Sequence, residues 1–201
     1  MKVIGICGGS GSGKTMISLM FNKYDVPAID TDNIYREITA ADGPCNRALA
    51  EAFGSEIISD DGSLNRKALA KIVFTGEGAK NKLETLNKIS HKFILDETRR
   101  RLSEYELKGK KAAIVDAPLL FESGFDKECD VVISVVADKE IRLKRIMRRD
   151  KIDRESAEAR INSQLSDDEI IARSDFVIVN SLDTLDLDDQ VYRTAKIILN
   201  N

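Results

Sequence analysis

The residues with the clearest chemical signature lie near the start of the chain, where residues 8–15 read GGSGSGKT. This stretch matches G-x-x-x-x-G-K-[ST], in which backbone amides surround a phosphate. Glycines adopt backbone angles that other residues avoid, and a helix that starts at such a loop favours an anion. The lysine spans the β- and γ-phosphates, and the hydroxyl binds Mg²⁺. The residues that we expect to hold the nucleotide are Gly8, Gly9, Ser10, Gly11, Ser12, Gly13, Lys14, Thr15 and Met16.

Acidic side chains follow the second predicted strand. Asp30 and Asp32 are two residues apart, so in an extended chain they point the same way. A carboxylate at this place accepts the proton of an attacking hydroxyl or holds Mg²⁺ through water. We predict Asp32 as the catalytic base, with an N-cap of the next helix as the alternative, and Asp30 as a support for the metal or the loop.

A third acid, Asp116, ends the apolar run within AAIVDAPLLFESG. An acid after an apolar strand is a usual place for a residue that supports Mg²⁺, so we group Asp116 with Thr15 at the metal. The alternative is a turn residue before Pro118. Leu119 and Leu120 come next, either as an apolar wall for a substrate or as ordinary core.

Residues 142–154 read RLKRIMRRDKIDR, of which seven of thirteen are Lys or Arg. Arg142, Arg145 and Arg149 fall on one helical face, and we predict a lid whose arginines meet the transferring phosphoryl group. A solvated basic face or a nucleic-acid patch is the alternative. Arg160 of the following helix is assigned to the same lid. His91, the only histidine, is kept as a substrate candidate, although such a residue more often belongs to a surface or core.

These side chains need a scaffold, and the pattern along the chain is of strands alternating with helices. We predict strands at residues 2–7, 26–30, 112–116, 131–136 and 176–179, and helices at 15–23 and 184–199. The run VVISVV at 131–136 does not alternate, as in a parallel strand covered on both faces. Repeated βα units imply a parallel sheet whose ligands gather at the carboxyl ends of its strands.

Two helical stretches interrupt this pattern. The first lies between the second and third strands, where Pro44 opens one helix and residues 79–107 form a long one. The second covers residues 140–173, in which Ser166 and Glu169 form a capping box.

Composition narrows the class of protein. The chain has 201 residues, 42% of them hydrophobic, and a formal net charge of −3, which disfavours a general nucleic-acid coat. No apolar stretch reaches about 18 residues, so no membrane span is expected. Cys7, Cys45 and Cys129 are far apart, which is typical of free thiols in a reducing cytosol.

At this point the chain resembles the dephospho-CoA kinase family over nearly its whole length. The resemblance includes the GGSGSGKT loop, Asp30-Thr-Asp32, the DAPLLFE segment at 116–122, Arg145 and Arg149 with Asp150, RINSQ at 160–164 and SDFVIVN at 174–180. There are two departures. His91 is followed by Lys92 where the family often has proline, and Ser181, Leu182 and Asp183 follow Asn180 where a glycine is usual.

The resemblance implies a P-loop kinase-like, three-layer α/β sandwich with a parallel five-stranded sheet. It implies a core of about residues 1–32, 108–139 and 174–201, a helical substrate-binding insertion of about 33–107 and a helical lid of about 140–173. It implies transfer of phosphate from ATP, with Mg²⁺, to the 3′-hydroxyl of the ribose of dephospho-CoA. Lys14, Asp32 and Arg149 would be catalytic, and Asn180 would begin the loop beside the adenine.

Under this interpretation the partner is a small molecule, with no nucleic acid, membrane or obligate protein partner, and the protein is cytoplasmic. Another small-molecule kinase, of nucleoside or shikimate type, is the first alternative. A non-kinase, RNA-associated NTPase that uses the basic patch at 142–154 is the second. A GTPase is disfavoured because the chain has no N-K-x-D segment.

Overall fold

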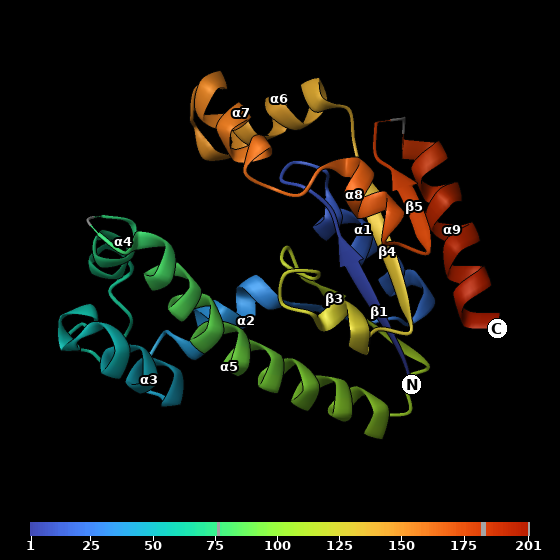
Figure 1. The fold of residues 1–201 in the computed structure, drawn as a ribbon. Helices are drawn as coiled ribbons and strands as arrows, with labels where there is room; N and C mark the ends of the chain where they lie inside the picture. Colours follow the sequence, from blue (N-terminus) through green and yellow to red (C-terminus); the bar gives the residue numbers. More distant parts are fainter. Residues whose placement is uncertain (76, 182–183, 201) are drawn as a thin grey trace. The chain divides into compact units, whose positions relative to one another are not determined.

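The structure is a computed structural model that describes residues 1–75, 77–181 and 184–200. The chain divides into two compact units. The core unit comprises Met1–Asp30 and Leu102–Asn201, and the helical unit comprises Thr31–Arg101. Figure 1 shows the elements of each unit, coloured along the sequence.

A single parallel sheet organises the core unit. Among the described residues its strands are β1 (Lys2–Cys7), β2 (Ala28–Asp30), β3 (Ala112–Asp116), β4 (Val131–Val136) and β5 (Phe176–Val179), in the order β2-β3-β1-β4-β5. Four of the predicted strands have these bounds, and the predicted parallel sheet is confirmed. Strand β2 is shorter than the predicted 26–30 because the Val26 amide still donates to the Phe21 carbonyl of the preceding turn.

Side chains alternate across β1, so its two faces pack against different segments of the chain. Ile4 and Ile6 are fully buried in a cluster with α1 (Lys14–Met20) and α9 (Thr184–Asn200). A Cβ atom on Gly5, which faces the other way, would lie 2.9 Å from Leu120, so the segment after β3 covers that face closely. Helix α1 starts at Lys14, one residue earlier than predicted. It gives way at Phe21 to a 3-10 turn, η1 (Phe21–Tyr24).

The rest of the core unit is helical between β4 and β5, as predicted. It comprises α6 (Lys139–Asp150), α7 (Arg154–Asn162) and α8 (Asp167–Ala172), and a 3-10 turn, η3 (Phe125–Glu128), precedes β4. Leu143, Ile146 and Ala157 form the buried contact between α6 and α7. The predicted capping box at Ser166 and Glu169 is confirmed, and it starts α8.

The helical unit has a core of its own. It contains α2 (Thr31–Ile38), α3 (Pro44–Phe53), η2 (Ser55–Ile57), α4 (Arg66–Phe74) and most of α5 (Ala79–Leu107). Pro44 takes the first turn of α3, as predicted, where its missing N–H costs nothing. Leu49, Ile57 and Val73 are fully buried among apolar side chains of α2 and α5.

Candidate active site

The phosphate-loop motif forms a turn that leads directly into α1. Gly13 caps the helix with a φ of 95°, a left-handed conformation that favours glycine. Its carbonyl accepts hydrogen bonds from the Met16 amide at 3.0 Å and the Ile17 amide at 3.3 Å. The Lys14 ammonium donates to the Gly8 carbonyl at 2.8 Å, across the mouth of the loop. The helix N-terminus and the lysine thus lie where an anion is favoured.

Asn180 and Arg145 hold the outside of the loop. The Asn180 amide nitrogen donates to the Ser12 carbonyl at 2.7 Å, and a Cβ atom on Gly13 would lie 2.1 Å from it. Arg145 donates through Nη1 to the Gly11 carbonyl at 3.1 Å and through Nη2 to the Asn180 carbonyl at 3.1 Å. Asn180 is only 3% exposed, so in this conformation its amide supports the loop. Leu182 and Asp183, where the sequence departs from the family, lie outside the described residues.

The predicted metal residues of the core unit lie together. The Thr15 hydroxyl donates to the Asp116 carboxylate at 3.3 Å, and the Ser18 hydroxyl donates to the same oxygen at 3.4 Å. Asp30 pairs with Asp116 in the register of β2 and β3, so both acids stand at the carboxyl edge of the sheet. Asp116 is buried and Asp30 is exposed.

This donor set fits Mg²⁺. The cation prefers oxygen ligands, keeps several waters, and is commonly held by one or two carboxylates together with substrate phosphates. Thr15, Asp116 and Asp30 supply a hydroxyl and two carboxylates beside the phosphate loop. No group of three or more His, Cys, Asp or Glu side chains suited to a metal occurs in the described part of the chain. Phosphate oxygens would therefore have to complete the coordination.

Asp32 and His91 belong to the helical unit. Asp32 is exposed in the first turn of α2, the helix that follows β2 without a connecting loop. Because α2 begins at Thr31, the alternative interpretation of Asp32 as its N-cap is wrong. His91 is half-buried in the middle of α5.

The predicted lid arginines have different surroundings. Arg149 is exposed and donates to Asp150 through Nε at 2.8 Å and Nη2 at 2.9 Å. Arg160 pairs with the same carboxylate. These guanidinium groups, Arg149 first, lower the pKa of Asp150, which keeps that carboxylate charged.

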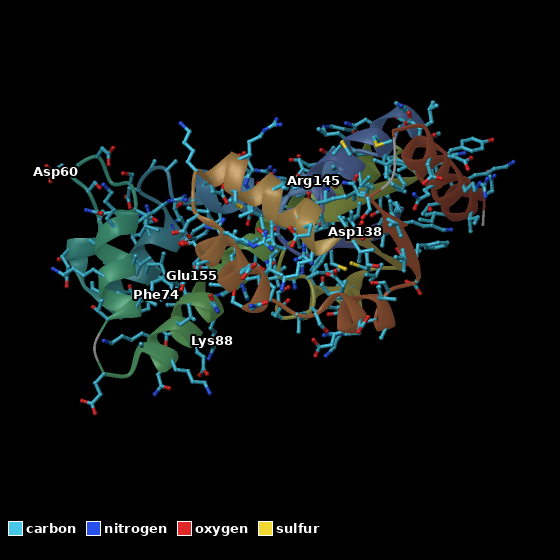
Figure 2. The ribbon with its side chains drawn as sticks, turned by 90° about the horizontal axis from the view of Figure 1, so that it is seen from above. Asp60, Phe74, Lys88, Asp138, Arg145 and Glu155 are labelled. Atoms are coloured by element: carbon cyan, nitrogen blue, oxygen red, sulfur yellow. The ribbon has the colours of Figure 1, made fainter. Side chains whose placement is uncertain are left out.

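Basic side chains of α6 also line an open cleft of about 520 Å³. Its lining residues are Lys144, Arg145, Arg148 and Arg149, of which Figure 2 labels Arg145.

Arg142 does not share this cleft. Its side chain is 4% exposed in α6 and is paired with Asp167 of α8. Arg142, which we grouped with Arg145 and Arg149 as a lid arginine, therefore has different surroundings from theirs. Gln164, the last residue of the RINSQ segment, lies beyond the end of α7.

The two leucines after β3, Leu119 and Leu120, differ in how far they are buried. Leu119 is 44% exposed and lines a small cavity of about 60 Å³ that also involves Gly8 and Glu122. Leu120 is fully buried beneath Gly5, so its position is that of a core residue and not of a wall that contacts the substrate.

Cys7 lines the same small cavity as Leu119, and burial raises the pKa of its thiol to about 11. A thiol with so high a pKa is a poor nucleophile near neutral pH.

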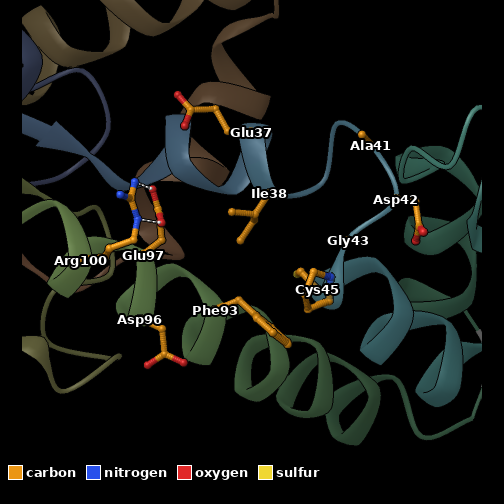
Figure 3. A pocket seen from close by; sticks show the side chains of 11 residues that line it. Glu37, Ile38, Ala41, Asp42, Gly43, Cys45, Phe93, Asp96, Glu97 and Arg100 are labelled. Atoms are coloured by element: carbon orange, nitrogen blue, oxygen red, sulfur yellow. Dashed lines mark hydrogen bonds and ion pairs between the residues drawn. The ribbon is translucent and has the colours of Figure 1, made fainter.

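The helical unit contains a larger cavity, of about 430 Å³ (Figure 3). Ile38 of α2, Phe93 of α5 and Cys45 of α3 form its apolar side, and its charged lining consists of four carboxylates and one arginine. Glu97 pairs with Arg100 and Arg101, and these partners, Arg100 first, lower its pKa to about 2. The lining residues are Glu37, Ile38, Ala41, Asp42, Gly43, Pro44, Cys45, Phe93, Asp96, Glu97 and Arg100.

Two polar residues of the site escaped the sequence reasoning. Ser18 contacts Asp116, and its spacing of three from Thr15 places both hydroxyls on one helix face, which is a readable signal. Asp167 pairs with Arg142, but an acid in the first turn of a capped helix already has a local explanation. Nothing in its own neighbourhood indicates the distant arginine.

Comparison with known proteins gives a consistent result. A family model described as dephospho-CoA kinase matches residues 2–186. A protein of Syntrophotalea carbinolica named dephospho-CoA kinase is 36% identical over 95% of this chain and 89% of its own length. A solved Thermus thermophilus structure matches with a TM-score of 0.80 and 27% identity, covering 100% of this chain and 98% of that one. The structure of dephospho-CoA kinase from Campylobacter jejuni matches with a TM-score of 0.71 and the same identity and coverage.

No helix in the described ranges is long and apolar enough to cross a membrane.

Proposed function

This chain belongs to the dephospho-CoA kinase family, and from that premise we propose that it transfers the γ-phosphoryl group of ATP to the 3′-hydroxyl of the ribose of dephospho-CoA. The products are ADP and CoA, and the reaction is the last step of CoA biosynthesis. The observation that carries the proposal is the family match over residues 2–186, which includes the phosphate loop, the acids at the sheet edge and the basic helix α6.

ATP binds through the phosphate loop in this account. The N-terminus of α1 and the Lys14 ammonium attract the β- and γ-phosphates. Thr15, Asp116 and Asp30 would hold Mg²⁺ beside the phosphate oxygens, where the cation would supply positive charge to offset the charge that develops during transfer. Asn180 leads the chain from β5 toward the adenine while its side chain supports the loop.

The acceptor hydroxyl is activated by Asp32, which accepts its proton as the bond to phosphorus forms. Asp32 is exposed at the first turn of α2. Arg149 and Arg160, held by Asp150, supply positive charge to the transferring group. His91 and Leu119 are the other proposed contacts with dephospho-CoA.

The cavity of the helical unit suits the uncharged arm of dephospho-CoA. The four carboxylates of the lining outnumber its one arginine and so disfavour the diphosphate, whereas they can accept hydrogen bonds from amide N–H groups. Ile38 and Phe93 would contact the aliphatic part. We expect Ala41→Phe, which adds a ring at the edge of the cavity, to raise KM for dephospho-CoA several-fold and to leave KM for ATP unchanged. Ala52→Phe, on the exposed side of α3, is the matched control. An unchanged KM for dephospho-CoA in Ala41→Phe would place the arm elsewhere.

A panel of acceptors tests the substrate class. Purified protein with ATP and Mg²⁺ should phosphorylate dephospho-CoA far faster than adenosine or shikimate. A preference for either of the others would replace the proposal with a different small-molecule kinase. Further proposals are a cytoplasmic location and the absence of an obligate protein or nucleic-acid partner.

A further inference from the structure

Arg142 is the most deeply buried cation of the basic helix α6, and its partners identify a role for it. Its Nη1 atom donates to both oxygens of Asp167, at 2.8 and 3.1 Å, and its Nε atom donates to the Ser10 carbonyl at 3.0 Å. This guanidinium is 4% exposed, and its Nε and Nη1 atoms are already engaged within the protein, so its charge is balanced by Asp167.

The amide of Ser10 is held as well. It donates at 2.8 Å to the side-chain oxygen of Gln164, in the turn between α7 and α8. Both backbone groups of Ser10 are therefore fixed by side chains from the segment that connects β4 and β5. Losing either partner would leave a half-buried backbone group of the loop without its protein hydrogen bond.

Two glycines of the loop show how closely α6 approaches. A Cβ atom on Gly9 would lie 2.0 Å from Nη2 of Arg142. A Cβ atom on Gly11, whose φ is 79°, would lie 2.8 Å from the Arg142 carbonyl oxygen. The loop is thus packed against this arginine on both sides of Ser10.

We infer that Arg142, Asp167 and Gln164 are positioning residues, which fix the tip of the phosphate loop in its nucleotide-binding conformation before the nucleotide arrives. Arg142 acts through the loop and is not a phosphate ligand. A loop that is already ordered loses less entropy when it binds a phosphate. The inference rests on the proposed use of ATP and is independent of the identity of the acceptor.

The test measures ATP and ADP binding by calorimetry, without an acceptor, for Asp167→Asn and Arg142→Lys. Each variant should lower the affinity for ATP and the affinity for ADP by the same factor, about tenfold. One lost hydrogen bond of about 1.4 kcal/mol corresponds to that factor. At saturating ATP, kcat should stay within about threefold of the wild type, since bound nucleotide restores the loop. Asp168→Asn, which removes the neighbouring exposed carboxylate of α8, should bind both nucleotides normally.

A loss confined to ATP in Arg142→Lys would overturn the inference, because it would identify Arg142 as a γ-phosphate ligand. Asp167→Asn behaving like Asp168→Asn would also overturn it. If Asp167→Asn fails to fold, Gln164→Leu tests the inference in its place. This change removes only the acceptor of the Ser10 amide and should lower the affinities for ATP and ADP equally. Wild-type protein that binds ADP but does not phosphorylate dephospho-CoA would contradict the proposed function and leave this inference standing.

Discussion

The Thr15 hydroxyl donates to the Asp116 carboxylate over 3.3 Å and so ties the first turn of α1 to the carboxyl end of β3. In the proposed complex both groups would hold Mg²⁺. Asp116→Asn should therefore raise the Mg²⁺ concentration for half-maximal activity by about 10–100-fold, the usual effect of removing a group that supports a metal site. A magnesium titration of initial rates measures the shift. Asp138→Asn, an exposed acid after β4, is the control. An unchanged titration for Asp116→Asn would remove this residue from the metal site.

Asp32→Asn tests the proposed base. Loss of a general base costs roughly 10²–10⁴-fold in rate, and the change should leave ATP affinity within about twofold because Asp32 contacts the acceptor. Single-turnover kinetics measure the rate and calorimetry the affinity. Asp25→Asn, an exposed acid before β2, should behave like the wild type. Near-normal turnover in Asp32→Asn would eliminate it as the base.

Gly13→Ala tests the loop geometry. Alanine would face both a φ of 95° and an Asn180 nitrogen 2.1 Å from its Cβ, so we expect ATP affinity to fall more than tenfold. The strained backbone should also cost about 1–3 kcal/mol of unfolding free energy. Gly109→Ala is a matched control, since Gly109 has a φ of 73° with nothing within 4 Å of its Cβ. That variant should share the strain and keep its ATP affinity. Equal affinities in both variants would contradict the close packing of Asn180.

Glu97 makes stability depend on pH in the acid range. Its pKa is lowered to about 2 by Arg100 and Arg101, below an unfolded value of about 4.3. The ion pairs therefore stabilise the fold fully above about pH 4.5, and this contribution is lost as the pH falls toward 2. Because the side chain is 20% exposed and the pairs are near the surface, we expect a contribution of about 1 kcal/mol.

Urea unfolding at pH 7 and pH 3 measures this contribution. Glu97→Gln should lower the unfolding free energy at pH 7 and have a smaller effect at pH 3. Glu84→Gln, on the exposed surface of the same helix, should change neither value. An effect of Glu97→Gln that is equal at the two pH values would show that the ion pairs are not its cause.

The sequence predicted most of the core unit because its signals are local. The strands are short apolar runs, the loop is a contiguous motif, and the acids follow strands whose carboxyl ends share one edge of the sheet. The second strand and the first helix differed by a few residues, where a 3-10 turn continues past Phe21.

Arg142 shows what local signals miss. In the sequence it is one of several arginines on a basic face, indistinguishable from Arg145 and Arg149. Its burial depends on Asp167, 25 residues further along, and on a carbonyl of the phosphate loop. Such a role follows from packing between distant segments, which neither periodicity nor charge pattern records.

The most direct test of the central claim is a product analysis with purified protein, ATP, Mg²⁺ and dephospho-CoA. We expect ADP and CoA in equal amounts, with the new phosphate on the 3′-hydroxyl of the ribose, as seen by phosphorus NMR and mass spectrometry. Hydrolysis of ATP without CoA, or phosphate on another hydroxyl, would contradict it.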